Sequence, residues 1–231
     1  MLRPSFIYFD IDDTILDHKT AQNNALRYVF ENFPCFAGTE FDLFSQTYAR
    51  INAGLWKQYS LGSIDRDSLQ RLRFADSIRE TGVDYTQAEE IGTAYMQAYR
   101  NEWTWIDGAR EALTALSRSY ELGFITNGFS ETQKLKAELF GLSDFSEHII
   151  ISEDVGHLKP SPEIFSYAEQ ISGSKGEKIL YVGDNFMSDI QGGNSAGWQT
   201  AWYTSGQDSL LCSQANFVFS RFDELTEALE C

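Results

Sequence analysis

The stretch Phe6-Ile7-Tyr8-Phe9-Asp10-Ile11-Asp12-Asp13-Thr14 decides how the rest of the chain is interpreted. Five of its first six residues are aromatic or β-branched, which predicts a buried strand. Side chains two apart in an extended segment point the same way, so Asp10 and Asp12 are expected to converge beyond the strand. Converging carboxylates repel unless a cation or a shared proton relieves them. The stretch therefore predicts a Mg²⁺ site, an acid–base pair, or both, unless Asp12 and Asp13 only cap a following helix.

Composition limits the classes of function that the chain can have. Its 231 residues suffice for one large domain or for a core with a smaller domain. A net charge of −16 argues against binding a nucleic acid polymer, which needs clustered Lys and Arg. Cys35, Cys212 and Cys231 show no metal-type spacing and indicate a reducing compartment without a disulfide framework. We find no signal peptide and no membrane-spanning apolar run, so a cytoplasmic protein without membrane contact is expected.

The first half of the chain has the periodicity of helices. Apolar residues at helical spacing predict helices over residues 21–33, 41–59, 65–81 and 86–100. The last of these begins with Thr86 and has Glu89 three positions later, which is the pattern of a capping box. No convincing strand interrupts residues 17–100. This block therefore reads as a helical bundle inserted after the first strand.

From residue 107 onward, strands and helices alternate. Short apolar runs predict strands over residues 120–126, 149–151, 179–182, 199–203 and 217–219. Helical patterns lie between them, over residues 108–119, 130–140, 162–171 and 188–196. Such alternation predicts an α/β fold in which a mainly parallel sheet is covered by helices on both faces.

Polar residues stand where the predicted strands end. These are Thr126 and Asn127, Lys159 in a later loop, and Asp184 with Asp189. Each has a plain structural alternative: a strand or N-cap threonine, a solvated lysine, a turn aspartate and an acid at a helix start. Because the carboxyl ends of parallel strands share one edge, we expect these groups to meet Asp10 and Asp12 there.

Taken together, these positions resemble the four motifs of the haloacid dehalogenase (HAD) superfamily of phosphotransferases. The resemblance implies a Rossmann-like core over residues 1–16 and 101–231, with an α-helical cap inserted at 17–100. Residues 52–56 with Tyr59 and Gly62, and the stretches 125–129 and 151–156, are similar to bacterial pyrimidine 5′-nucleotidases. This closer resemblance implies a nucleotidase acting on a small phosphomonoester.

The HAD resemblance also implies a role for each site residue. Asp10 is expected to attack phosphorus and form an aspartyl-phosphate. Mg²⁺ is expected to be held by Asp10, Asp184 and the carbonyl of Asp12, with Asp189 in support. Lys159, Thr126 and the amide of Asn127 would bind the phosphoryl oxygens. Asp12 would protonate the leaving oxygen and later take a proton from water.

Other functions remain compatible with these residues. A phosphatase for a sugar phosphate or phosphoglycolate would need the same core. A 2-haloacid dehalogenase would use the aspartate nucleophile without Mg²⁺ or a leaving-group acid, and a phosphomutase or a non-catalytic binding protein would keep the fold. Specificity is expected in the cap, where Asn52, Trp56, Tyr59 and Arg73 are candidates. At helical spacing, Trp56 and Tyr59 can also be core residues.

Overall fold

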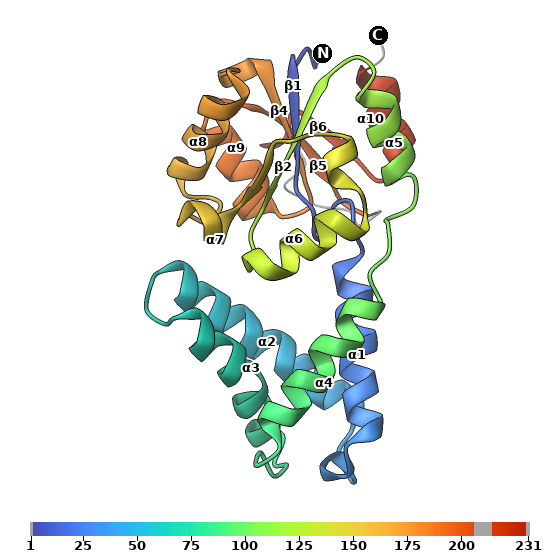
Figure 1. Ribbon diagram of the computed structural model, residues 1–231, viewed down its shortest axis with the longest axis vertical. Helices are drawn as coiled ribbons and strands as arrows, with labels where there is room; N and C mark the ends of the chain where they lie inside the picture. The colour runs from blue at the N-terminus through green and yellow to red at the C-terminus, as the bar shows by residue number, and fades with distance from the viewer. Residues whose placement is uncertain (1, 206–213, 230–231) are drawn as a thin grey trace. The chain divides into compact units, whose positions relative to one another are not determined.

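The computed structural model describes residues 2–205 and 214–229 (Figure 1). The chain forms two compact units. We call residues Met1–Asp17 with Trp105–Cys231 the core unit, and His18–Thr104 the helical unit. In chain order, the helical unit is an insertion between the first and second strands of the core unit.

The core unit is built on a six-stranded sheet in which every neighbouring pair is parallel. The strands run in the order β3-β2-β1-β4-β5-β6, so β1 lies inside the sheet with β2 and β4 as its neighbours (Figure 1). Their bounds are β1 Phe6–Phe9, β2 Glu121–Thr126, β3 Ile149–Ile151, β4 Ile179–Gly183, β5 Gln199–Tyr203 and β6 Phe217–Phe219. The predicted α/β fold is confirmed, and the carboxyl end of β1 lies at the centre of one sheet edge.

Strand β1 is buried on both faces, which explains its continuous apolar sequence. Ile7 and Phe9 pack into one hydrophobic cluster, and Phe6 and Tyr8 into another on the opposite face. The first cluster is covered by α5 (Ala109–Leu116), α6 (Ser130–Leu139) and α10 (Phe222–Leu229), and the second by α8 (Pro162–Ser172). Short helices α7 (Ser152–Val155) and α9 (Gln191–Ser195) complete the set. Helices on both faces leave the ends of the strands as the open part of the sheet.

The two connections to the inserted residues are tied together within the core unit. The Ile106 amide donates to the Ile15 carbonyl oxygen at 2.9 Å, and Leu16 forms an antiparallel bridge with Trp105. The chain therefore leaves and re-enters the core unit along two adjacent backbone segments.

The helical unit contains four long helices, as predicted. They are α1 His18–Asn32, α2 Phe41–Ser60, α3 Arg66–Glu80 and α4 Ala88–Asn101. Helix α2 packs on α3, α3 on α4, and α1 on α4. Tyr48, Phe74 and Tyr95 meet between them, with ring centroids 5.0–5.8 Å apart. Tertiary packing of apolar faces supplies most of the stability of such helices, and these aromatic contacts are part of it.

The capping box predicted at Thr86 is wrong. Helix α4 begins at Ala88, and its N-cap Gln87 makes no side-chain capping bond. Asp84 binds Thr86 instead: it accepts from the Thr86 amide and from the Thr86 hydroxyl, each at 3.0 Å. An aspartate two residues earlier can form this local turn, and here it competes with the cap.

Two further expectations concern cysteines and membranes. Cys35 is a free, half-buried thiol, while Cys212 and Cys231 lie outside the described residues. Across residues 2–205 and 214–229, no helix combines the length and apolar character needed to cross a bilayer.

Candidate active site

Asp10 follows β1 directly and is buried at the centre of the sheet edge. Its amide still donates to the Val182 carbonyl oxygen at 2.8 Å, so the residue is fixed by the β1–β4 ladder. The Thr14 hydroxyl donates to Asp10 Oδ2 at 3.2 Å and lies 3.5 Å from Asp184 Oδ1. A rigid strand therefore presents this carboxylate, and a second residue of the same stretch orients it.

Lys159 brings a buried positive charge to Asp10. Its Nζ lies 2.6 Å from Asp10 Oδ1 and 2.9 Å from Asp189 Oδ1. The same ammonium donates to the Ile125 carbonyl oxygen at 2.9 Å and to the Tyr181 hydroxyl at 2.7 Å. The plain alternative of a solvated loop lysine does not apply.

Asn127 fixes the loop that carries Lys159. The Asn127 side chain accepts from the Lys159 amide and donates to the Lys159 carbonyl oxygen, each at 2.8 Å. This reciprocal pair joins the end of β2 to a loop 32 positions later. The side chain of Asn127 thus has a positioning function, which sequence reasoning did not foresee.

Three carboxylates meet at the same edge. Asp10, Asp184 and Asp189 each offer an oxygen, and these oxygens lie within 4.8 Å of one another. Asp189 is fully buried and accepts from the Asn185 amide and the Ser188 hydroxyl, each at 3.0 Å. Gly183 makes room for it, because a Cβ there would lie 2.4 Å from Asp189 Oδ2. The glycine in the Gly183-Asp184 pair is therefore a steric requirement of the site.

The electrostatics of the cluster follow from its burial. Burial raises the pKa of Asp10 well above its usual range; Lys159 opposes this shift, and Asp189 and Asp184 add to it. Burial alone would lower the pKa of Lys159, but Asp10 and Asp189 together raise it well above its usual value. Lys159 is thus held as a cation, and the neighbouring carboxylates of Asp189 and Asp184 disfavour the ionised form of Asp10.

These oxygens fit a divalent cation. Three converging carboxylate oxygens form a hard donor set of the type that Mg²⁺ and Ca²⁺ prefer. One lysine cannot neutralise three carboxylates, so a cation of charge two would restore the balance. Asp10, Asp184 and Asp189 are the residues that could hold it.

Thr126 ends β2 with a buried hydroxyl. Its Oγ1 has no hydrogen-bond partner, and the residue has no exposed surface. A buried hydroxyl without a partner costs roughly 1–3 kcal/mol, which a bound acceptor would remove. Thr126 is therefore a candidate donor to a ligand, as the sequence led us to expect.

The Asp12 carboxylate is held apart from the other three. It accepts from Gln133 Nε2 at 2.8 Å and from Lys136 Nζ, both on helix α6. Among the described residues, the cluster of converging carboxylate oxygens contains Asp10 but not Asp12. The expectation that the i, i+2 spacing brings the carboxylates of Asp10 and Asp12 to one point is therefore wrong. Gln133 and Lys136 were missed by sequence reasoning, although both are polar residues on a helix face that also buries Ala137.

Comparison with known proteins now assigns the family. The family model of haloacid dehalogenase-like hydrolases matches residues 6–197, which include every site residue of the core unit described above. The chain belongs to the HAD-like hydrolases. The resemblance based on four short motifs is therefore confirmed.

This HAD hydrolase has several curated relatives. It is 37% identical to the HAD-hydrolase YfnB of Bacillus subtilis over 209 residues, 87% of this chain and 85% of YfnB. It is 34% identical to the pyrimidine 5′-nucleotidase YjjG of Escherichia coli over 199 residues, 85% of this chain and 84% of YjjG. It is 29% identical to the glyceraldehyde 3-phosphate phosphatase of Pyrococcus furiosus over 238 residues, 100% of this chain and 95% of that protein.

A solved structure of a HAD hydrolase extends the comparison. The magnesium-bound crystal structure of Bacillus subtilis YfnB superimposes on this chain with a TM-score of 0.83 at 32% identity. It covers 99% of this chain and 100% of YfnB. A related protein of the same fold thus binds magnesium.

The four candidate specificity residues all lie in the helical unit. Asn52 has a buried Oδ1 without a hydrogen-bond partner. Trp56 and Tyr59 are half-buried and pack edge to face with centroids 5.7 Å apart. Arg73 is buried, with Cζ 5.3 Å from the ring centroid of Phe74. None of the four is a fully exposed side chain, and the two aromatic residues retain some accessible surface.

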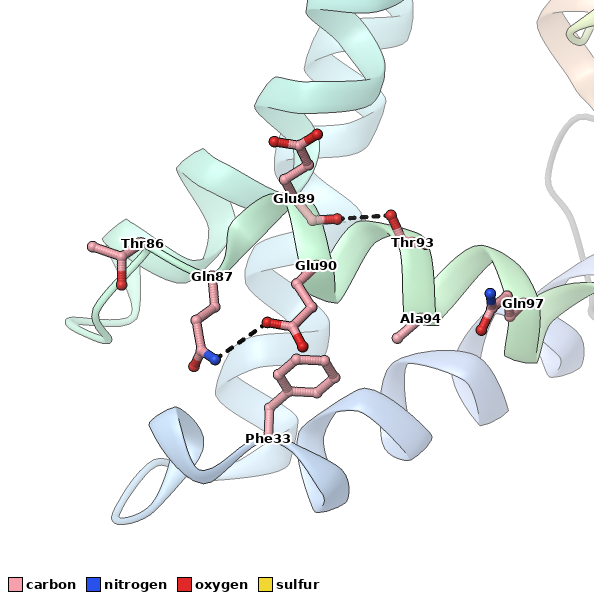
Figure 2. A pocket seen from close by; sticks show the side chains of 8 residues that line it. All are labelled: Phe33, Thr86, Gln87, Glu89, Glu90, Thr93, Ala94 and Gln97. Atoms are coloured by element: carbon pink, nitrogen blue, oxygen red, sulfur yellow. Dashed lines mark hydrogen bonds between the residues drawn. The ribbon is translucent and has the colours of Figure 1, made fainter.

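A hollow on the helical unit differs in character from the carboxylate site. It has a volume of about 610 Å³, and Figure 2 shows Glu90 pointing across it toward Phe33. The side-chain Nε2 of Gln87 donates to Glu90 Oε2 at 3.4 Å. Its lining residues are Phe33, Thr86, Gln87, Glu89, Glu90, Thr93, Ala94 and Gln97. Two glutamates and no cationic side chain line this hollow, so it does not suit a phosphate.

Proposed function

We propose that this HAD hydrolase is a Mg²⁺-dependent phosphomonoesterase that forms an aspartyl-phosphate on Asp10. The observation that carries the proposal is the buried Asp10 carboxylate, with Lys159 Nζ at 2.6 Å and Asp184 and Asp189 beside it. A carboxylate becomes an effective nucleophile toward phosphorus only where the charge of the phosphoryl group is neutralised and the group is held in line.

Charge neutralisation comes from fixed groups in this proposal. Asp10, Asp184 and Asp189 would hold Mg²⁺, together with the carbonyl of Asp12. When bound, Mg²⁺ supplies Lewis-acid neutralisation of the phosphoryl oxygens. Lys159 adds a second cation, and the hydroxyl of Thr126 and the amide of Asn127 add hydrogen bonds to those oxygens. Because these residues stand on fixed elements of the core unit, the proposed mechanism requires little reorganisation during the reaction.

Asp12 is assigned the proton transfers. Its carboxyl group gives a proton to the leaving alkoxide oxygen as the Asp10–phosphorus bond forms. The resulting carboxylate then removes a proton from the water that hydrolyses the aspartyl-phosphate. General acid–base help of this kind contributes roughly 10²–10⁴-fold to the rate.

For the substrate, we propose nucleoside 5′-monophosphates, with pyrimidine nucleotides preferred. Support comes from the 34% identity to the nucleotidase YjjG and from the nucleotidase-like stretch at residues 52–62. We assign substrate choice to the helical unit, as a cap whose half-buried Trp56 or Tyr59 stacks on the base. Stacking on an aromatic side chain contributes roughly 1–3 kcal/mol per base. That free energy corresponds to a preference of about 5- to 150-fold.

A sugar phosphatase is the second candidate, because the glyceraldehyde 3-phosphate phosphatase relative covers this entire chain. A dehalogenase is less consistent with the site, since halide leaves without protonation and Asp12 would have no role. A phosphomutase would need Asp12 for the same proton transfers, so net release of inorganic phosphate separates it from a phosphatase. A non-catalytic binding protein would leave Asp12 without a role.

A substrate panel tests the proposal. We would measure kcat/KM for dUMP, dTMP and UMP against AMP, phosphoglycolate, glyceraldehyde 3-phosphate and a hexose phosphate. Pyrimidine nucleotides are expected to give the highest values, and either Trp56→Ala or Tyr59→Ala should reduce only these. Tyr28→Ala, which removes an exposed aromatic residue of α1, is the matched control. A clear preference for a sugar phosphate would refute the nucleotidase assignment, and full activity after chelation would refute the metal requirement.

A further inference from the structure

Two side chains of helix α6 bind both oxygens of the Asp12 carboxylate. Gln133 Nε2 donates to Asp12 Oδ2 at 2.8 Å, and Lys136 Nζ donates to Asp12 Oδ1. We propose that Gln133 and Lys136 are positioning residues that fix the Asp12 carboxyl group for both proton transfers of the reaction. This inference rests on the proposed function of Asp12, and it adds residues that no motif of the family resemblance contains.

The burial of these two side chains supports a dedicated role. Gln133 is only 3% exposed and Lys136 only 1% exposed. They are three positions apart, so they occupy the same face of the helix. Burying an amide or an ammonium group is unfavourable unless polar partners offset the lost hydration. Asp12 provides such a partner for each of them, although two buried positions on this helix face are then occupied by polar rather than apolar side chains.

Gly128 provides an independent observation. A Cβ on Gly128 would lie 2.6 Å from Gln133 Nε2 and 2.9 Å from Gln133 Cγ. A Cβ at these distances would force the flexible side chain of Gln133 to move, and the φ angle of Gly128 does not itself require glycine. The absence of a side chain on Gly128 therefore leaves room for Gln133 in the position from which it reaches Asp12.

The hydrogen bonds from Gln133 and Lys136 to the Asp12 carboxylate have a direct consequence for proton transfer. A free aspartate can adopt several staggered rotamers, and only some place its oxygen near a leaving group. Contacts at both carboxylate oxygens select one of them. Because a misplacement of about 1 Å can cost roughly 10²-fold in rate, a fixed rotamer is a large part of what a general acid contributes.

The test uses substrates that differ in their need for an acid. We would measure kcat/KM of Gln133→Leu and Lys136→Met for an alkyl phosphate and for p-nitrophenyl phosphate. The phenolate leaves with little protonation, so the alkyl substrate should lose about 10- to 100-fold more than the aryl substrate. Lys136→Arg keeps a cation and should restore part of the loss. A merely structural defect would reduce both substrates equally.

Lys134→Met is the matched control. Lys134 lies on the same helix, is 64% exposed at its side chain, and pairs with Asp154 at 2.9 Å on the surface. It should leave both substrates within about twofold, because exposed ion pairs contribute little. If Lys136→Met does not fold, Gln133→Leu and Gly128→Ala carry the test, since Gly128→Ala displaces Gln133 while both polar side chains, Gln133 and Lys136, are retained. Crystal structures of these variants should show the Asp12 carboxylate in more than one position.

Asp12→Asn separates the two proposals. If Asp12→Asn does not lose activity selectively on the alkyl phosphate, the proposed role of Asp12 fails, whatever α6 does. If Asp12→Asn shows the selective loss but Gln133→Leu and Lys136→Met reduce both substrates equally, the positioning role is overturned. In the Asp12→Asn background, Gln133→Leu is expected to have no further effect on the ratio of alkyl to aryl activity.

Discussion

Replacing Lys159 by methionine should strongly destabilise the metal-free enzyme. The ammonium lies 2.6 Å from Asp10 and 2.9 Å from Asp189, and the lysine is almost fully buried. Methionine fills a similar volume but leaves both carboxylates buried without their cation. Breaking a buried ion pair from one side costs roughly 3–5 kcal/mol. For a unit of this size, that corresponds to a fall in melting temperature of about 6–20 °C.

The loss should depend on pH in a defined direction. Lys159 opposes the rise in the pKa of Asp10, so its removal raises that pKa further. When the pKa of a carboxyl group is higher in the folded than in the unfolded state, the free energy of unfolding falls as pH rises from the unfolded pKa through the folded pKa. The difference between wild type and Lys159→Met should therefore be larger at about pH 8 than at about pH 5.

Urea unfolding in the presence of a chelator measures this effect, with Lys134→Met as the control on the surface pair with Asp154. The control should lose no more than about 1 kcal/mol. Adding Mg²⁺ should recover part of the stability of Lys159→Met, because a divalent cation also neutralises Asp10. If Lys159→Met is no less stable than Lys134→Met at about pH 8, the electrostatic reasoning is wrong.

Three other perturbations have defined outcomes. Asp10→Asn should reduce turnover by about 10⁴-fold or more, as loss of a covalent nucleophile does in other enzymes. It should not lower the melting temperature. Substantial activity in a pure sample would contradict the assignment of Asp10 as nucleophile. At pH values below the raised pKa of Asp10, the Mg²⁺ affinity measured by calorimetry should increase by up to about tenfold for each unit of rise in pH, because Asp10 must lose its proton before it binds the cation. An affinity that does not change with pH would exclude Asp10 as a ligand. Gly183→Ala places a Cβ 2.4 Å from Asp189 Oδ2 and should cost about 1–3 kcal/mol and weaken Mg²⁺ binding. Its control, Gly54→Ala, meets no atom within 4 Å in helix α2 and should be neutral or slightly stabilising.

The parts of the fold that follow from local periodicity were predictable. The helices of the insertion and the strands of the sheet were expected within a few residues of their observed bounds, because each depends on its own pattern of apolar residues. The central place of β1 was not predictable from periodicity, since strand order depends on which crossover connections pack best. The failed cap at Thr86 shows the limit of a local motif: Asp84, two residues away, offered a better partner.

The site was predictable where side chains stand at strand ends. Asp10, Thr126 and Asp184 follow this rule, because parallel strands share one carboxyl edge. Gln133, Lys136 and the Tyr181 hydroxyl were missed. Each of them is a buried polar group, and its partner lies more than 20 positions away in the sequence. Only tertiary packing decides whether such a group is buried against a carboxylate or turned to solvent.

The hydrogen bond between the Ile106 amide and the Ile15 carbonyl oxygen joins the two ends of the insertion within the core unit, so the stability of the core unit should depend little on the length of the inserted chain. The ends of the insertion are joined at the base, as the stem of a hairpin joins the ends of its loop. Because the entropy of closing a loop grows only by about 0.6 kcal/mol per doubling of length, inserts of very different size can be exchanged at nearly constant cost to the sheet. Under the proposed function, a different insertion between residues 17 and 105 would change substrate choice and leave the residues of the carboxylate site unaltered.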